Sequence, residues 1–222
     1  MRMFNPAGTR NRPRIAVLIS GRGSNLPSLL GNDLGGDIVV IGSNKVEAKG
    51  LDIARDAGID NFVVSHKDFS SREAFDAAMV AALNVYRPDL VVLAGFMRIT
   101  TPEFTQAFAG RLINIHPSLL PSFPGLHTHA RALEDGVKLH GCTVHFVTPE
   151  LDRGPIIAQA AVQVDDDDTP DTLAAKVLQQ EHQIFPYAVR LFCEGRLVVN
   201  GLRVTTLPKS ASPVIATSST RV

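Results

Sequence analysis

Short apolar runs alternate with amphipathic segments along most of the chain. The runs that predict strands are residues 14–20, 37–41, 62–64, 89–95 and 111–115. The segments that predict helices between them are residues 26–30, 47–57 and 71–86. Strands that alternate with helices at this spacing predict an α/β fold: a Rossmann-like, mainly parallel twisted sheet flanked by helices. The run 89–95 is the most hydrophobic, which predicts a central strand.

The pattern changes after residue 125. A short helix is predicted over 128–134, and two strands that pair in antiparallel fashion over 143–147 and 156–164. A long helix follows over 171–194, and residues 196–204 predict a closing strand or hairpin. The fold prediction therefore adds a C-terminal antiparallel part and a long C-terminal helix to the parallel sheet.

The chain shows no internal repeat and no linker that would separate two domains. We therefore predict a single domain over residues 1–206, in which residues 1–13 are a flexible lead-in. Residues 207–222 are rich in Ser, Thr and Pro, which predicts a disordered tail.

Composition narrows the classes of partner. The chain has 22 Lys and Arg against 22 Asp and Glu, so no overall charge favours nucleic acid or an anionic membrane. No apolar run approaches the length of a membrane span. The only cysteines are Cys142 and Cys193, which fits a reducing cytoplasm. We predict a cytoplasmic protein, monomer or homodimer, that acts on small molecules with no nucleic-acid or membrane partner.

A glycine-rich turn, Gly21-Arg22-Gly23-Ser24-Asn25, follows the first strand directly and opens a helix. Glycines let the backbone approach an anion, and a helix amino end offers free N–H groups. The third glycine of the dinucleotide fingerprint is replaced by Leu26, and no acid ends the second strand. The turn therefore predicts a phosphate monoester site rather than an NAD site. The alternative is a tight turn in which Asn25 caps the helix.

A proline-stiffened stretch, residues 114–125, carries the first candidate catalytic groups. Asn114 and His116 are two residues apart, so on an extended backbone they project from the same face. An amide that can donate to an oxyanion then lies beside an imidazole that can carry a proton near neutral pH. The alternative is an ordinary proline-rich turn with a capping histidine.

A second rigid loop, residues 148–155, holds Asp152, whose carboxylate could lie against His116 and fix the imidazole's orientation. The alternative is a surface turn with solvated acids. The acidic run 165–168 has no accompanying ligand spacing, and His127 and His129 have no third ligand in view. No metal site is predicted.

Together these motifs resemble the folate-dependent formyltransferases, in particular the phosphoribosylglycinamide formyltransferase family. The resemblance spans residues 14–199. The motifs that carry it are Ile19-Ser20-Gly21-Arg22-Gly23-Ser24-Asn25, Leu93-Ala94-Gly95-Phe96-Met97-Arg98-Ile99, Asn114-Ile115-His116-Pro117-Ser118-Leu119-Leu120-Pro121 and Leu151-Asp152-Arg153-Gly154-Pro155. The resemblance implies direct transfer of a formyl group from 10-formyltetrahydrofolate, the co-substrate, to the amine of 5-phosphoribosylglycinamide, without a metal.

The resemblance also implies roles for individual residues. The catalytic residues would be Asn114, His116 and Asp152. Those that bind the ribonucleotide would be Gly23, Ser24, Asn25, Gln179, Gln180 and Glu181. Those that bind the folate would be Arg72, Met97, Arg98, Ile99, Thr100, Asn114, Thr148, Pro149, Glu150, Leu151 and Asp152. Leu178 stands where relatives can carry a polar residue, which puts one ribonucleotide contact in question.

Two other functions fit parts of this pattern. A formyltetrahydrofolate deformylase would let water attack the same formyl group; that relative usually carries an amino-terminal regulatory domain, and 13 residues precede the first predicted strand here. A non-catalytic nucleotide-binding protein would keep the glycine-rich turn. It would have no reason to retain Asn114, His116 and Asp152 together.

Overall fold

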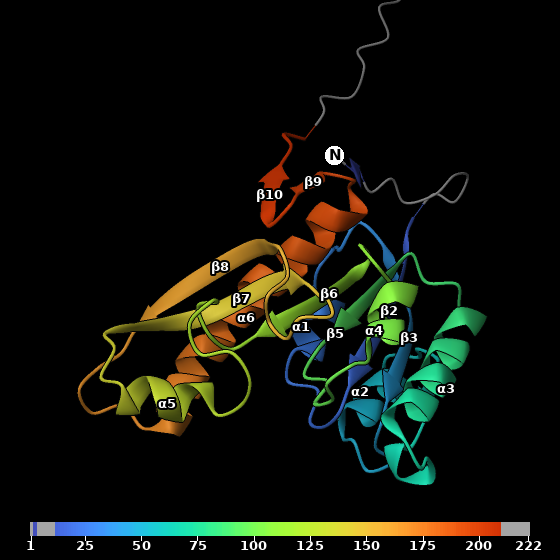
Figure 1. Ribbon diagram of the computed structural model, residues 1–222, viewed down its shortest axis with the longest axis horizontal. Coiled ribbons are helices and arrows are strands. Elements are labelled where there is room, and N and C mark those ends of the chain that lie inside the picture. Colours follow the sequence, from blue (N-terminus) through green and yellow to red (C-terminus); the bar gives the residue numbers. More distant parts are fainter. Residues whose placement is uncertain (1, 4–11, 210–222) are drawn as a thin grey trace, which may run out of the picture.

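The computed structural model describes residues 2–3 and 12–209, and these residues form one mixed sheet of ten strands with helices on both faces (Figure 1). The strands are β1 (Arg2–Met3), β2 (Arg14–Ile19), β3 (Asp37–Ser43), β4 (Asn61–Val63), β5 (Leu90–Leu93), β6 (Leu112–His116), β7 (Leu139–Phe146), β8 (Ile156–Gln163), β9 (Leu197–Asn200) and β10 (Arg203–Thr206). The helices are α1 (Leu26–Leu30), α2 (Gly50–Asp56), the 3-10 turn η1 (His66–Asp68), α3 (Arg72–Val85), α4 (Pro102–Ala107), α5 (Thr128–Glu134) and α6 (Pro170–Cys193).

The strand order is β1-β9-β10-β8-β7-β6-β5-β2-β3-β4. Strands β2 to β6 pair in parallel, whereas β7 pairs antiparallel with both β6 and β8. β9 and β10 form an antiparallel hairpin after the long helix α6. The predicted fold class is confirmed, including the antiparallel addition and the long C-terminal helix, and β5 lies inside the sheet as predicted.

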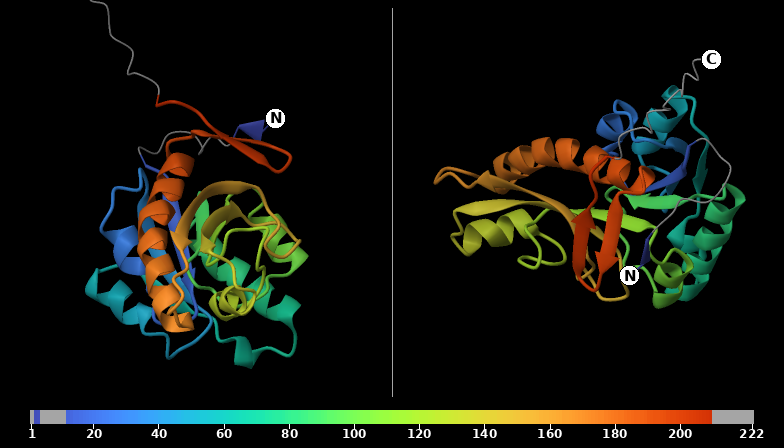
Figure 2. Two further views of the ribbon diagram at one scale, coloured as in Figure 1. Left: turned by 90° about the vertical axis from the view of Figure 1, so that its left-hand side faces the viewer. Right: turned by 90° about the horizontal axis from the view of Figure 1, so that it is seen from above.

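Two hydrophobic cores lie on opposite faces of the sheet. Helices α1, α2 and α6 cover one face, and α3 and α4 cover the other (Figure 2). Side chains along β2 alternate between the cores: Ile15 and Val17 enter the first, whereas Ala16 and Leu18 enter the second. All four are fully buried, because a strand covered on both faces has no polar side.

The sheet order reverses beside β2, which pairs with β3 on one side and β5 on the other. At such a switch point, the loops after the two adjacent strands separate and leave space at the carboxyl edge of the sheet. The loop after β2 is the glycine-rich turn, residues 21–25, and the loop after β5 begins at Ala94. The topology therefore directs both candidate binding segments to one edge.

Several details differ from the sequence prediction or lie beyond it: among them, β7 begins at Leu139 rather than at residue 143, and the 3-10 turn η1 was not predicted. Helix α4 was not predicted: it is a short helix that begins at Pro102 and is capped by Thr101. Helix α2 begins at Gly50 rather than at residue 47. Within the predicted lead-in, Arg2–Met3 pair with β9, while residues 4–11 lie outside the described residues.

The predicted disordered tail also lies mostly outside the described residues, since the description ends at residue 209. Among the described helices, none is long and apolar enough to cross a membrane.

Candidate active site

Asn114 and His116 lie two positions apart at the carboxyl end of β6, so their side chains project from the same face of the strand, as the sequence predicts. The antiparallel neighbour of Asn114 is His145 on β7. The Asn114 Nδ2 lies 3.2 Å from the His145 Nε2. Asn114 is thus held by a residue that sequence reasoning did not select.

The tautomer of His145 follows from its other nitrogen. Its Nδ1 lies 2.9 Å from the Phe146 carbonyl oxygen, which can only accept a hydrogen. Burial lowers the pKa of His145, so the neutral ring is favoured and Nε2 accepts from the Asn114 amide. An amide with one N–H committed to His145 keeps its second N–H for another acceptor.

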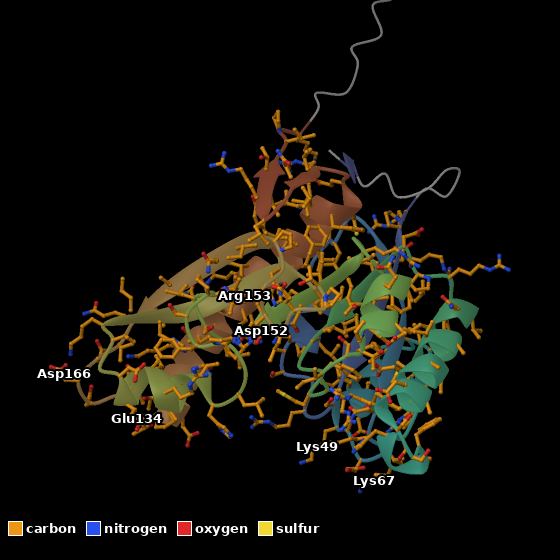
Figure 3. The ribbon with its side chains drawn as sticks, in the orientation of Figure 1. Lys49, Lys67, Glu134, Asp152, Arg153 and Asp166 are labelled. Carbon is orange, nitrogen blue, oxygen red and sulfur yellow. The ribbon has the colours of Figure 1, made fainter. Side chains whose placement is uncertain are left out.

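His116 and Asp152 come together at this edge although 36 positions separate them in the sequence. The His116 Nδ1 lies 3.6 Å from the Asp152 Oδ2, and both side chains are buried. That carboxylate oxygen also accepts from the Gly125 amide at 2.8 Å. Asp152 lies among the loops in the middle of the molecule, whereas Asp166 lies beyond the far end of β8 (Figure 3). We call Asn114, His116 and Asp152 the candidate trio.

The other ring nitrogen of His116 faces a carbonyl: its Nε2 lies 3.0 Å from the Phe123 oxygen. Both nitrogens of the imidazole therefore face oxygen atoms. Phe123, His127 and Asp152 all have positive φ, between 52° and 56°. Non-glycine residues in this conformation are strained and gather at functional sites, because surrounding contacts must hold them there.

The loop between His116 and Gly125 is held by hydrogen bonds to the side chains of Thr143 and Gln159. The Thr143 hydroxyl donates to the Ser118 carbonyl and accepts from the Leu120 amide, at 2.6 and 3.0 Å. Gln159 donates to the Leu120 carbonyl at 2.9 Å. The loop that carries His116 is therefore fixed by side chains from β7 and β8.

The glycine-rich turn packs tightly against α2. A Cβ at Gly23 would lie 2.9 Å from the Gly50 Cα, and φ at Gly23 is +71°. Asn25 stands at the N-cap position of α1 without capping it. Its Nδ2 instead donates to the Glu181 Oε2 at 2.8 Å, while Ser24 offers its carbonyl to the His182 ring at 2.8 Å. Helix α6 thus meets the turn through two adjacent residues.

The three candidate ribonucleotide residues on α6 differ in burial. Glu181 is buried against Asn25, Gln180 is half-buried and Gln179 is exposed. Consecutive helical positions point about 100° apart, so the three cannot share one direction. Of the three, Glu181 hydrogen-bonds to the glycine-rich turn, through Asn25. Leu178 is half-buried on the same helix.

Glu181→Gln is expected to stabilise the protein at neutral pH. Burial raises the pKa of Glu181 above its ordinary value of 4.5, with the Asn25 hydrogen bond acting against it. A raised pKa means that the folded state binds more protons, so stability falls as pH rises through the folded pKa. Gln keeps an oxygen for Asn25 and does not ionise. We expect chemical denaturation at about pH 5 and about pH 7 to show a smaller pH-dependent loss for Glu181→Gln than for the parent; parallel pH dependence in both proteins would contradict this.

The candidate folate residues come from three segments: the start of α3, the residues that follow β5, and the loop between β7 and β8. Met97, Ile99 and Leu151 are exposed at 67%, 56% and 52% despite being apolar. Arg98, Thr100 and Thr148 are half-buried. The further candidates Arg72, Pro149 and Glu150 are exposed. Large apolar side chains left exposed are a feature of ligand sites.

Within the described residues, no group of three or more His, Cys, Asp or Glu side chains could hold a metal ion. The acidic run before α6 is occupied by a lysine instead: Lys176 pairs with Asp165 and Asp168, each at 2.6 Å. That a metal is not required stays a prediction.

Sequence reasoning missed two residues of this site, His145 and His182. Each contacts a selected residue, Asn114 or Ser24 respectively, through a pairing of distant elements. The sequence feature that could have indicated His145 is a histidine within the apolar run of β7. The feature that could have indicated His182 is its position directly after Glu181 in the sequence.

The formyl transferase family matches residues 13–189 of the chain. The phosphoribosylglycinamide formyltransferase of Escherichia coli is 51% identical over 187 residues, which are 82% of this chain and 88% of that protein. The crystal structure of glycinamide ribonucleotide transformylase 1 from Symbiobacterium toebii is 48% identical, covers 90% of this chain and 96% of its own, and has a TM-score of 0.88. A formyltetrahydrofolate deformylase from Pseudomonas syringae pv. tomato is 29% identical over 89% of this chain and 66% of its own, with a TM-score of 0.83.

Proposed function

Because the chain belongs to the formyl transferase family, we propose that it transfers the formyl group of 10-formyltetrahydrofolate to the amine of 5-phosphoribosylglycinamide, in purine biosynthesis. The family resemblance drawn from the four motifs is confirmed. The observation that carries the proposal is the candidate trio, with its amide, imidazole and carboxylate at one edge of the sheet.

Attack of an amine on a formyl carbon places negative charge on the formyl oxygen and positive charge on the nitrogen. The second N–H of Asn114 would donate to that oxygen. His116 would donate a proton to the formyl oxygen as the charge develops, which requires its Nε2–H to leave the Phe123 carbonyl because its Nδ1 faces Asp152. When the tetrahedral carbon collapses, the formyl oxygen would return that proton and the bond to the folate nitrogen would break. The folate nitrogen would take the proton that the attacking amine loses, so that tetrahydrofolate leaves. Asp152 would orient the imidazole and stabilise its charged form.

The ribonucleotide is assigned to the glycine-rich turn and α6. Gly23, Ser24 and Asn25 would hold its phosphate through backbone N–H groups and the Asn25 side chain. Glu181, with Gln179 and Gln180 on the same helix, would contact the rest of the nucleotide. Support comes from the Asn25–Glu181 hydrogen bond, which joins the two segments and leaves the second N–H of the Asn25 amide for a further acceptor.

The folate is assigned to the segments around Met97 and Leu151. Residues 97–100 and 148–152, with Arg72 and Asn114, would line its pocket. Support comes from the exposed apolar side chains of Met97 and Ile99, and from that of Leu151, which directly precedes Asp152 in the chain. An apolar lining with a few fixed polar groups suits a flat ring system with polar edges.

One assay separates transfer from hydrolysis. The protein is mixed with 10-formyltetrahydrofolate, with and without 5-phosphoribosylglycinamide, and tetrahydrofolate and formate are followed. We expect tetrahydrofolate to appear only when the ribonucleotide is present, without formate. Formate release without the ribonucleotide would support a deformylase, the function of one structural neighbour. No turnover under either condition would favour a non-catalytic nucleotide-binding protein.

The compartment and partners follow from the same proposal. We place the enzyme in the cytoplasm, as a monomer or homodimer that acts on small molecules. Support comes from Cys142 and Cys193, which are both free and buried. Burial raises the pKa of each thiol to about 12, so neither is suited to act as a nucleophile.

A further inference from the structure

The segment between β5 and α4, residues 97–101, is fastened at both ends by side chains from other elements; we call it the wall segment. At one end the Met97 amide donates to the Ser20 Oγ at 2.7 Å. At the other the Thr101 amide donates to the Asp76 Oδ2 at 2.6 Å. Ser20 comes directly after β2, and Asp76 belongs to α3. Both acceptors are buried, so water cannot replace them freely.

Between these two fixed ends, the wall segment exposes its apolar side chains. Met97 and Ile99 are the exposed members, while Thr101 is buried and its Oγ1 caps α4. An irregular segment that leaves apolar side chains in water would be free to fold them inward unless its backbone were held. The two buried acceptors therefore preform a surface for a ligand.

Asp76 is a charged residue at a position of α3 where an apolar side chain would be expected. It follows Phe75 on α3 and is 2% exposed, on the helix face that packs into the second core. Burial raises its pKa, while the Thr101 hydrogen bonds and the charges of Arg98 and Arg72 act against that rise. Its Oδ1 has no hydrogen-bond partner among the described residues, and neither has the buried Nε of Arg98.

A carboxylate in this environment costs stability, because burying a charged group is expensive even when it is hydrogen-bonded. An apolar residue would pack better against the core of α3. The side-chain hydrogen bonds of Asp76 within the described chain go to Thr101, in the wall segment. The hydrogen bond to the wall segment therefore explains why a buried aspartate stands at position 76.

We propose that Asp76 is a positioning residue for folate binding: by accepting from the Thr101 amide, it fixes the wall segment against which the folate packs. This rests on the proposed function, which assigns residues 97–100 to the folate pocket. Ser20 holds the other end in the same way. The hydrogen-bond acceptor, rather than the negative charge, performs this role.

Two substitutions at Asp76 separate acceptor from charge. Asp76→Ala removes the acceptor, whereas Asp76→Asn keeps an oxygen of nearly the same shape. We expect Asp76→Ala to raise both the KM for 10-formyltetrahydrofolate and the Kd for tetrahydrofolate, measured by titration calorimetry, by about tenfold. The KM for the ribonucleotide and kcat should stay within about twofold. Asp76→Asn should recover the Kd to within about threefold of the parent.

A second pair of variants covers the case in which Asp76→Ala does not fold. Thr101→Pro removes the donor hydrogen, and φ of −74° at Thr101 suits proline. Thr101→Ala is its matched control, because it keeps the N–H and loses only the hydroxyl, which caps α4 and also hydrogen-bonds to Asp76. We expect Thr101→Pro to weaken tetrahydrofolate binding by about tenfold relative to Thr101→Ala.

The outcomes distinguish this inference from the function on which it rests. If the parent protein binds tetrahydrofolate and Asp76→Ala or Thr101→Pro binds it equally well, the positioning role is overturned while the proposed function stands. Equal weakening for folate and ribonucleotide would also overturn it, since that result indicates general structural damage. A parent protein that binds no tetrahydrofolate would overturn both.

Discussion

Asp152→Asn is expected to lower kcat by about 100- to 10,000-fold, the range that acid–base groups contribute, while both KM values change by less than about fivefold. The amide can still accept from the Gly125 N–H, as the carboxylate does now at 2.8 Å, so the loop should keep its shape. What is lost is the negative charge 3.6 Å from the His116 Nδ1. Steady-state and single-turnover kinetics of formyl transfer would measure the loss.

His116→Ala is expected to lower kcat by a similar factor. In the double variant, the fold loss of kcat should be far smaller than the product of the two single losses. Asp152 acts through the imidazole, so once His116 is gone its carboxylate has little left to contribute. Asp166→Asn is the matched control: Asp166 is exposed, pairs with Lys138 and lies far from the site. Independent, multiplicative losses in the double variant would show that the two residues do not form a unit, and Asn114 would then be the principal support for the oxyanion.

The parallel part of the fold could be predicted from the sequence because a strand buried on both faces is an uninterrupted apolar run. Residues 15–19 are all apolar and all fully buried. The approximate place of the site followed as well, since the carboxyl ends of parallel strands share one edge. Helix α4 carried no such signature: it spans Pro102–Ala107 and is too short for a hydrophobic period to develop.

The side-chain contacts within the site could be predicted only in part, because they depend on how strands and loops that are distant in the sequence pack together. The residues alone left open whether Asp152 lies against His116 or in a surface turn, and the family resemblance implied the first. The structure puts the Asp152 Oδ2 3.6 Å from the His116 Nδ1. That Asn114 would face His145 depends on the register between β6 and β7, which no local pattern specifies. His145 therefore could not be selected, although it holds the amide in place.

Asn25 shows how tertiary structure overrides a local preference. Asparagine directly before a helix is a common N-cap, and the sequence left that alternative open. In the structure its side chain does not cap α1 but donates to Glu181, 156 positions later. A buried carboxylate beside the turn competes successfully for the amide, because a hydrogen bond to a charged group is stronger than a neutral cap.

Gly23→Ala is expected to raise the KM for 5-phosphoribosylglycinamide by about tenfold or more, while the KM for 10-formyltetrahydrofolate stays within about twofold. A Cβ at this position would lie 2.9 Å from both the Gly50 Cα and the Leu26 side chain. The Gly50 backbone cannot rotate away, and its amide already donates to the Gly21 carbonyl at 3.0 Å. The turn would therefore have to shift, and the N–H groups proposed to hold the phosphate would move with it.

Gly58→Ala provides the matched control for backbone strain. Gly58 has φ of +66°, close to the +71° of Gly23, but a Cβ there would meet nothing within 4 Å. Both substitutions place a side chain in the left-handed region, at about 1 kcal/mol, so both should lower the thermal midpoint. Only Gly23→Ala should change the ribonucleotide KM, because only its Cβ displaces the turn. If the two variants lose stability to the same extent and neither changes that KM, the glycine-rich turn does not hold the phosphate, and the ribonucleotide must be anchored through α6 instead.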